Sequence, residues 1–227
     1  MGYREPVPSG SSNTSATTPR RRAGRPTSAA SKERGDGRTL VTAAAREAFA
    51  EYGYHGVSIR AIAKAADVSM SAMYHYYPGK QELLFALLQD GIADYHRICR
   101  AALDVAGDDP VAHLDALVGA TVRYRATHKV ESNLMLSEVR NLNEDFQAQL
   151  REPQDAATTT MTEIISAGIR SGQFTTKYPD DARRAVFAMC NSVAHWYDPS
   201  GPISLDELVT RYWELAHALV GYREQAD

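Results

Sequence analysis

The chain has 227 residues, 44% of them hydrophobic, with 25 Lys and Arg against 28 Asp and Glu and a formal net charge of −3. This length suffices for one or two domains with a buried core. No stretch is apolar over the roughly 18 residues that a membrane span needs, and the N-terminus lacks the apolar segment of a secretory signal. The only cysteines, Cys99 and Cys190, are far apart, which favours reduced, buried thiols. We therefore expect a cytoplasmic protein without membrane contact.

The charge is unevenly distributed along the chain. Residues 1–80 hold 12 Lys and Arg against 6 Asp and Glu, whereas residues 81–227 hold 13 against 22. A basic front on an acidic body indicates a polyanionic partner for the front alone. A basic tail that only keeps the protein soluble explains part of this excess, but four basic residues lie beyond any tail: Arg46, Arg60, Lys64 and Lys80. The distribution favours contact with nucleic acid.

Residues 1–35 are rich in Ser, Thr, Pro and Ala and contain few large apolar side chains. Such a segment cannot bury enough surface to order itself, so we expect a disordered basic arm over residues 1–35. Within it, the segment RRRAGRP places Arg25 in a setting that resembles the core of an AT-hook, whose arginine reads a narrow minor groove. A tail without DNA contact is the alternative.

From about Asp36 onward the pattern is helical. The first helix, ending at Gly53, carries apolar residues at three- and four-residue spacings: Leu40, Ala44, Ala48 and Phe49. Ser58 is a good N-cap for a short second helix that turns four residues inward: Ile59, Ile62, Ala63 and Ala66. Ser69 caps a third helix, which Pro78 ends. A long fourth helix follows with one apolar side: Leu83, Leu84, Leu87, Leu88 and Ile92.

The rest of the chain also has helical periodicity. Asp109 and Pro110 have the order of a cap followed by proline at the first helical position, and the helix they open carries an apolar stripe: Leu114, Leu117, Val118, Thr121 and Val122. Further helices are expected over about 130–141, 144–171, 179–197 and 205–221, the last opened by Ser204–Glu207 with capping-box spacing. No useful alternating strand pattern occurs, so the sequence predicts an all-α protein.

The second and third helices are joined by ADVS, Ala66–Ser69, which gives them helix-turn-helix dimensions, with the second helix of the pair entering the DNA major groove. On that helix Met73 and Tyr77 are four residues apart and should face inward with Val68. The other positions should face wholly or partly outward, where they can contact phosphates and bases: Met70, Ser71, Ala72, Tyr74, His75 and Tyr76. Lys80, at the start of the fourth helix, should act as a phosphate clamp.

Residues 40–88 resemble the DNA-binding domain of TetR-family transcriptional repressors. The positions that carry the resemblance are Phe49, Gly53, Ser58, Ile62, Ala63, Ala66, Val68, Ser69, Tyr74, Tyr77, Lys80 and Leu83. In that family a three-helix DNA-binding head sits on a larger helical body for ligand binding and dimerisation. The resemblance implies an all-α protein with a DNA-binding domain over residues 36–82 and a ligand-binding and dimerisation domain over residues 83–227.

Carried over position by position, the resemblance implies base or phosphate contacts from a set of seven: Ser58, Arg60, Ser69, Ser71, Tyr74, His75 and Lys80. Met70 and Ala72 complete the sequence-reading face. The family pattern usually has Gly where Asp67 and Ser71 stand and often Thr where Ala72 stands; Asp67 can still adopt a turn conformation, whereas Ala72 removes a hydroxyl contact. The alternatives are partial burial of Tyr74 against the first helix and a merely solvated His75.

In TetR-like proteins the last two helices pair across a two-fold axis as a four-helix bundle. This chain offers two apolar stripes there: Val186, Met189, Val193 and Tyr197, then Leu208, Tyr212, Leu215 and Leu219. Such stripes are usually core, but two of them at a C-terminus also suit an isologous homodimer. Two heads about 34 Å apart read a palindrome, which one short helix cannot do.

Residues 190–221 and 134–146 resemble a subset of TetR regulators that sense acyl-CoA thioesters, including regulators of fatty-acid and steroid-ring catabolism in actinobacteria. An acyl-CoA needs an apolar tunnel together with cationic or amide groups for its phosphates and pantetheine. The candidate ligand-binding residues are Tyr124, Met135, Arg140, Asn191, His195 and Trp196. Core packing or a surface ion pair is the alternative for each of them.

No catalytic or metal motif is found. The seven histidines are scattered, and there is no Cys-x-x-Cys, His-Glu-x-x-His or Gly-rich phosphate loop. We therefore expect neither enzyme activity nor a cofactor. The sequence predicts a transcriptional repressor that binds a palindromic double-stranded DNA operator as a homodimer and is released by a small effector, an acyl-CoA thioester, through a population shift. A sensor of drugs or other hydrophobic compounds and a ligand-independent architectural DNA-binding protein are the alternatives.

Overall fold

The computed structural model describes Met1–Gly2 and residues 28–223. For residues 28–36 and 153–154 it describes the backbone alone. Arg25 and most of the expected basic arm lie outside the described residues. Apart from one isolated antiparallel bridge between Phe174 and Tyr222, the elements of the described chain are helices, which confirms the all-α prediction. Within it, no helix is long and apolar enough to cross a membrane.

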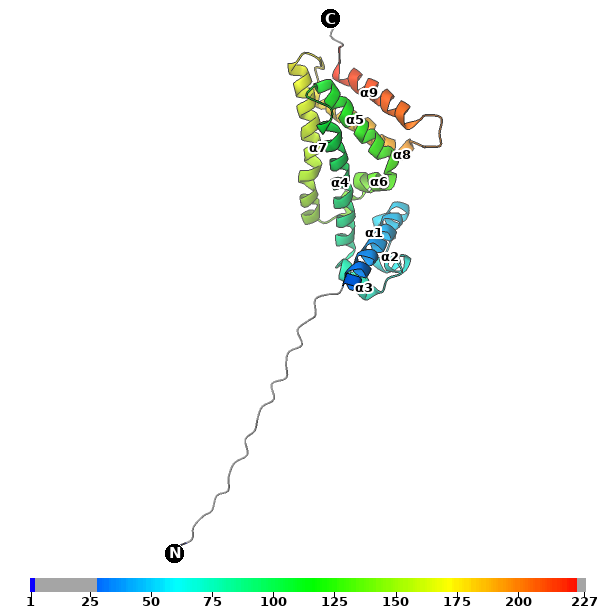
Figure 1. Cartoon of the computed structure of the whole chain (residues 1–227), viewed down its shortest axis with the longest axis vertical. Coiled ribbons are helices and arrows are strands. Elements are labelled where there is room, and N and C mark those ends of the chain that lie inside the picture. The colour runs from blue at the N-terminus through cyan, green and yellow to red at the C-terminus, as the bar shows by residue number, and fades with distance from the viewer. Residues whose placement is uncertain (3–27, 224–227) are drawn as a thin grey trace.

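A three-helix head lies at one end of the molecule: α1 (Ser28–Gly56), α2 (Ile59–Ala65) and α3 (Met70–Tyr76) (Figure 1). The first helix begins eight residues before the expected boundary at Asp36, because residues 29–34 are mostly Ala, Lys, Glu and Arg, which are good helix formers. Gly53 kinks α1 where its end was expected, with φ 69° and ψ 169°, and a last turn carries the helix on to Gly56.

The buried face of α1 agrees with the predicted stripe at Phe49 and differs from it at Leu40. Val41, Ala45 and Phe49 are buried, whereas Leu40 is exposed. Ala44 and Ala48 are half-buried against the same core. The error at Leu40 arose because its spacing from Ala44 fits a helix as well as that of Val41 from Ala45 does. Which face is covered depends on α2 and α4, which pack against α1.

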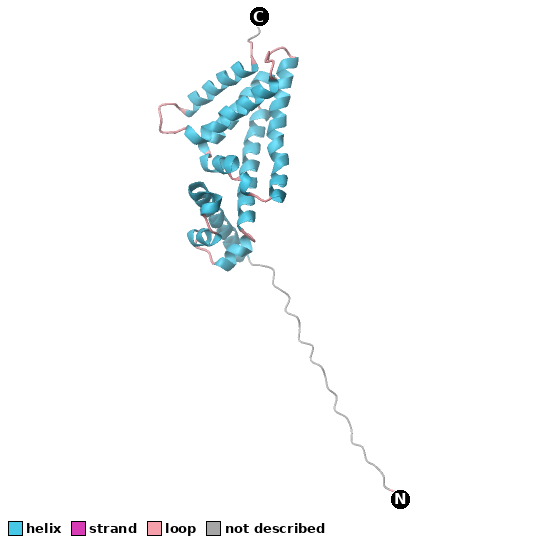
Figure 2. Ribbon diagram, turned by 180° about the vertical axis from the view of Figure 1, so that it is seen from behind, coloured by secondary structure: helices cyan, strands magenta, loops and turns pink. Residues whose placement is uncertain are grey.

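The body consists of α4 (Lys80–Asp104), α5 (Pro110–Thr127), α6 (Lys129–Ser137), the 3-10 turn η1 (Val139–Asn141), α7 (Glu144–Arg170), α8 (Pro179–Trp196) and α9 (Leu205–Val220). The long α4 runs from the head into the body beside α7, as seen from both sides in Figures 1 and 2. Helix α5 is the central element, in contact with α4, α7, α8 and α9. The apolar stripes predicted for the fourth and fifth helices are buried. The helix expected over 130–141 is divided at Glu138 into α6 and η1.

Most of the predicted dimer stripe belongs to the core of one chain. Val186, Val193 and Tyr197 of α8, and Leu208 and Tyr212 of α9, are buried against α5 and the rest of the body. The large apolar side chains of these two helices that remain exposed are Trp196, Leu215 and Leu219, with Met189 half-buried. Periodicity could not separate these two faces, because α8 and α9 each have one apolar side in the core and further apolar residues outside it. Cys99 and Cys190 are free and buried, as expected.

Candidate DNA-binding surface and effector pocket

The third helix presents the residues expected at the DNA. Ser71, Tyr74 and His75 are exposed, and Tyr74 at 51% exposure does not pack into the head as the alternative required. Met70 and Ala72 are half-buried. Met73 and Tyr77 are buried, as predicted from their spacing. Helix α3 therefore divides into an inner side that attaches it and an outer side that is free.

Tyr77 attaches α3 to the first helix. Its hydroxyl accepts a hydrogen bond from Arg38 Nε at 3.2 Å and lies 3.2 Å from Thr42 Oγ1. The Arg38 guanidinium also lies over the Tyr77 ring, 5.1 Å from its centroid. Arg38 and Thr42 are one helical turn apart on α1, so they reach the same phenol. These contacts join the end of α3 to α1.

Two of the expected phosphate contacts serve as helix caps. Ser58 Oγ accepts from the backbone N–H of Ala61, and Ser69 Oγ accepts from that of Ala72, both at 3.1 Å. A serine hydroxyl that accepts one hydrogen bond still has its own proton to donate. Asp67, in the turn between the two helices, has φ 54°, the left-handed conformation expected at this position. Arg60 is exposed on α2.

Lys80 lies at the junction of head and body. Its Nζ is 4.1 Å from the centroid of the Tyr54 ring, at the end of α1. The side chain is half-buried, and this burial lowers its pKa from the usual value. Lys80 therefore packs on the head, which was not foreseen from its position after Pro78.

The same junction contains a hydrogen-bond network. Gln81 Nε2 donates to the Tyr54 hydroxyl at 2.7 Å and to the Asn141 carbonyl at 2.8 Å, and its Oε1 accepts from Asn143 N at 2.8 Å. His55 Nε2 lies 3.1 Å from Asn141 Oδ1. The loop after α6 is thus joined both to α4 and to the end of α1.

Glu138, at the end of α6, adds to these contacts. Its Oε2 accepts from Tyr54 N at 3.4 Å and from Asn141 Nδ2 at 2.5 Å. Nearby along α6, Glu131 forms an ion pair with Arg46 of α1 at 3.4 Å. Helix α6 is therefore the part of the body that contacts the head most directly besides α4.

A cavity of 410 Å³ lies in the body between α4, α5, α6, α7 and α8. Its lining is both apolar and basic: Ile92, Tyr95, His96, Arg125, Met135, Leu136, Ala157, Thr158, Arg183, Arg184, Phe187, Ala188 and Asn191. We call this cavity the effector pocket. It contains three arginines and no Asp or Glu, so it suits a ligand with an apolar part and negative charge.

Arg125 is the most deeply buried basic residue of the effector pocket, at 4% exposure. Its guanidinium lies over the Tyr95 ring, 4.7 Å from the centroid, and 5.7 Å from that of Tyr124. Its Nε donates to Asn191 Oδ1 at 3.1 Å, and its Nη1 lies 3.9 Å from Met135 Sδ. Burial lowers the pKa of Arg125 from its usual value.

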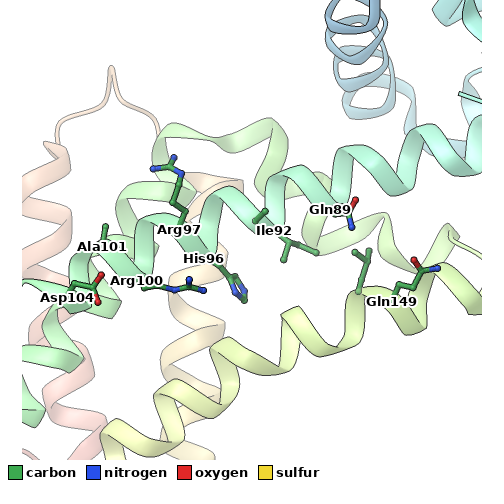
Figure 3. A pocket seen from close by; sticks show the side chains of 10 residues that line it. Gln89, Ile92, His96, Arg97, Arg100, Ala101, Asp104 and Gln149 are labelled. Atoms are coloured by element: carbon green, nitrogen blue, oxygen red, sulfur yellow. The ribbon is translucent and has the colours of Figure 1, made fainter. Parts of the chain in front are cut away.

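His96 borders the effector pocket and two adjoining cavities. A groove of 590 Å³ between α4 and α7 shares Ile92 and His96 with the effector pocket, and a small cavity of 120 Å³ shares Tyr95 and His96. In Figure 3, His96 and Arg100 point from α4 toward α7. Burial, and then the charge of Arg100, lower the pKa of His96 from its usual value. Both effects favour the neutral form of His96.

The structure brings together only part of the predicted ligand-binding set. Met135 and Asn191 line the effector pocket. Tyr124 is buried beside it, stacked on His128 with ring centroids 4.5 Å apart. The other three lie outside the pocket lining, exposed on η1 and at the end of α8: Arg140, His195 and Trp196.

The sequence reasoning missed Arg125, His96, Arg183 and Phe187. A signal for Arg125 was present, because it continues the stripe of Leu114, Val118, Thr121 and Val122 at helical spacing on α5. A charged residue on an otherwise apolar helix face marks a buried polar site. The other three come from different helices, and only the fold places them together.

Comparison with known proteins agrees with this architecture. The family model described as bacterial regulatory proteins, tetR family, matches residues 41–87, and the Tetracyclin repressor-like C-terminal domain matches residues 107–220. The chain is 28% identical over 184 residues to the HTH-type transcriptional repressor KstR2 of Rhodococcus jostii (strain RHA1), covering 77% of this chain and 86% of that protein.

Two solved structures share the fold. A bacterial regulatory protein in the tetR family from Rhodococcus RHA1 has a TM-score of 0.77 and 27% identity, over 83% of this chain and 98% of that chain. AibR, solved in complex with isovaleryl coenzyme A and operator DNA, has a TM-score of 0.73 and 20% identity, over 83% of this chain and 100% of that chain. With both family models matched and the helix-turn-helix in place, the chain belongs to the TetR family and is a DNA-binding transcriptional regulator, not an enzyme.

Proposed function

We propose that this regulator is a repressor that binds a palindromic operator as a homodimer and is released by an acyl-CoA thioester. The observation that carries the effector part is the charge of the effector pocket, which has three arginines and no acidic residue in its lining. An acyl-CoA combines an apolar chain with anionic phosphates. Ile92 and Phe187 suit the chain, and Arg183 and Arg184 suit the phosphates.

The relatives support the same class of effector. AibR, whose fold this chain shares, binds isovaleryl coenzyme A and operator DNA in its solved complex. Because a DNA-bound repressor acts at the chromosome, the proposal also implies a cytoplasmic location.

The homodimer is supported by the apolar residues left outside the core of α8 and α9. Trp196 is 48% exposed, and Leu215 and Leu219 of α9 are exposed as well. In a two-fold contact, α8 and α9 of one protomer would pack on the same helices of its partner. These side chains would then be buried in both protomers. Each head of such a dimer would read one half-site.

At each half-site the outer side of α3 would lie in the major groove. Met70, Ser71 and Ala72 would face the bases, since they come first on the recognition helix. The remaining contacts would go to phosphates, which position the head without reading sequence: Ser58, Arg60, Ser69, Tyr74, His75 and Lys80. Arg25, outside the described residues, would add a minor-groove contact.

Helix α6 offers a path from effector to head. Met135 and Leu136 line the effector pocket, and Glu138 directly after them contacts Tyr54 of the head. An effector that displaces the end of α6 would change the position of the head, and with it the spacing of the two heads in a dimer. The effector can shift this balance only by its differential affinity for the two states, typically about 1–3 kcal/mol.

The two alternatives have weaker support. A sensor of lipophilic cationic drugs would need acidic or aromatic groups without competing positive charge, whereas Arg125, Arg183 and Arg184 all line the effector pocket. A ligand-independent architectural protein would have no use for this pocket. It would also show no operator preference.

A gel-shift titration tests the proposal. The protein is first bound to an operator that it prefers over random DNA, and acyl-CoAs and the corresponding free acids are then added. We expect release by at least one acyl-CoA series. Thermal-shift measurements with lipophilic cations serve as the comparison, and stabilisation by these cations but not by CoA thioesters would favour the drug sensor.

A further inference from the structure

We propose that Arg125 binds a carboxylate at the far end of the effector's acyl group, so that the effector is anionic at both ends. The inference deepens the proposed function and depends on it only for the thioester end. The site of the carboxylate consists of Arg125 on α5 and Asn191 on α8, which both line the effector pocket.

Arg125 carries a buried positive charge that no acidic side chain of the described residues compensates. Arg125 is 4% exposed, and no Asp or Glu in the described part of the chain forms an ion pair with it. A guanidinium remains protonated in proteins, and a buried charge is stable only when it is paired or hydrogen-bonded. Its neighbours Tyr95, Tyr124 and Met135 are uncharged. The site therefore holds a buried positive charge without a negative partner among the residues that the structure describes.

Arg125 and Asn191 also have hydrogen-bond donors without an acceptor in the described part of the chain. Arg125 uses Nε for Asn191 Oδ1 and points Nη1 at the sulfur of Met135, a weak acceptor. Among the described residues, neither Nη2 of Arg125 nor Nδ2 of Asn191 has a hydrogen-bond partner. A carboxylate has two oxygens and can accept a pair of bonds from one guanidinium. The Asn191 amide group would add a third donor.

Two further arginines of the effector pocket, Arg183 and Arg184, lie nearer the solvent than Arg125. The Arg183 side chain is 16% exposed and that of Arg184 65%, so the arginines of the pocket range from buried to open. Arg183 Nε is buried without a hydrogen-bond partner, and the nearest carboxylate oxygen, of Asp180, is 3.9 Å away. Arg184 Nη1 pairs with Asp181 Oδ1 at 2.9 Å on the exposed side of α8, where a phosphate of coenzyme A could replace that carboxylate. The two outer arginines leave the buried Arg125 for the other end of the ligand.

The lining between Arg125 and the two outer arginines suits a short carbon chain. Ile92 and Phe187 are apolar, and burial and Arg100 both favour the neutral form of His96. The volume of 410 Å³ lies within the range of about 300–1,000 Å³ for small-molecule sites. An acyl group that is apolar along its length and charged at its tip therefore matches the pocket better than a fully apolar one.

Four matched probes test the inference by isothermal titration calorimetry: octanoyl-CoA, the mono-CoA thioester of suberic acid (suberyl-CoA), octanoate and suberate. The two thioesters differ only in the terminal carboxylate. We expect suberyl-CoA to bind about 10- to 100-fold more tightly than octanoyl-CoA, the ratio typical of a charged hydrogen-bonded pair. Equal or tighter binding of octanoyl-CoA would overturn the inference, as would no binding of any of the four.

Variants then assign the preference to Arg125. Arg125→Met keeps the unbranched apolar stem of the side chain without its charge and should abolish the preference for suberyl-CoA. Arg125→Lys keeps the charge but not the bidentate geometry, and should retain a reduced preference. This variant tests the inference if Arg125→Met does not fold. The matched control is Arg123→Met, since Arg123 lies on the same helix but pairs with Asp206 outside the pocket. A full preference in a folded Arg125→Met protein would contradict the inference.

The same probes separate this inference from the proposed function. If octanoyl-CoA releases the operator and suberyl-CoA does not, the acyl-CoA repressor stands and the carboxylate site falls. If octanoate or suberate binds in an Arg125-dependent manner while neither thioester binds, the carboxylate site stands. The thioester part of the proposed function then falls.

Discussion

The Nε2 atom of Gln81 lies 2.7 Å from the hydroxyl oxygen of Tyr54 and donates a hydrogen bond to it. The same nitrogen donates to the carbonyl of Asn141, so one side chain joins α4, the end of α1 and the loop after α6. Head and body share an apolar core, and polar contacts that can be removed singly connect them as well. This makes the proposed coupling between effector and operator open to direct measurement.

Gln81→Leu should weaken that coupling. Without the amide, α4 loses its bonds to the loop after α6 and to Tyr54, so a displaced α6 moves the head less. We expect the effector to bind as before but to lower operator affinity by a smaller factor, measured by gel shift with and without effector. Asp90→Ala, an exposed change on the same helix, should leave the factor unchanged. An unaltered factor in Gln81→Leu would exclude this route.

Lys80→Ala should weaken binding to all DNA sequences and lower the slope of log affinity against log salt by about 1, because one phosphate contact is lost. Fluorescence anisotropy over a salt series measures both. Lys177→Ala, an exposed lysine between α7 and α8, is the control. An unchanged salt slope would mean that the contact with the Tyr54 ring is the only role of Lys80.

Tyr74→Phe should likewise weaken binding to all sequences without a change in preference. The hydroxyl of this exposed side chain would be lost as a phosphate donor, at a cost of about 0.5–1.5 kcal/mol. Binding measured on the operator and on single-base variants distinguishes the roles. A loss confined to one base pair would place Tyr74 on a base instead of a phosphate.

Leu215→Glu should shift the protein from dimer to monomer, because a carboxylate would be buried at the two-fold contact. Sedimentation velocity over a range of concentrations measures the dissociation constant. Val105→Glu is the control, since Val105 is exposed at the end of α4, outside the proposed interface. If Leu215→Glu dimerises as the wild type does, the interface lies elsewhere.

Gly168→Ala should destabilise the fold. A Cβ at Gly168 of α7 would overlap the ring of Phe174, which is buried directly against it. Overpacking of this kind costs about 1–3 kcal/mol. Urea denaturation followed by circular dichroism measures the free energy of unfolding, and Glu163→Ala on the exposed side of α7 is the control. Equal stability of the two variants would show that the Phe174 ring can move aside.

His96 should make the fold less stable at acidic pH. Its pKa is lowered in the folded state, by burial first and then by Arg100, so the unfolded chain takes up the proton first as the pH falls. The contribution is therefore complete above about pH 6.5 and is lost as the pH falls through the folded-state pKa. The melting temperature of His96→Gln should fall less between pH 7 and pH 5 than that of the wild type. Parallel curves would contradict this.

Local chemistry predicted most of the helices. Ser58, Ser69, Asp109 and Ser204 each accept the backbone hydrogen bond expected of an N-cap. These signals lie within three residues of the bond they predict, so they can be read from the sequence alone. The division of α3 into an inner and an outer side follows in the same way from the helical period.

Which helix faces meet was decided by tertiary structure. The periodicity of α1 allowed two adjacent faces, and packing against α2 and α4 buried the one with Val41. The stripes on α8 and α9 were resolved into core and surface only by the packing of both helices on α5 and of α8 on α6 and α7. The effector pocket is the clearest case, because Arg125, His96, Met135 and Asn191 come from four helices. The sequence alone determined the helices, their caps and the DNA-binding head, since these depend on neighbouring residues. The three-dimensional packing decided the effector pocket, because a cavity is made by contacts between residues far apart in the chain.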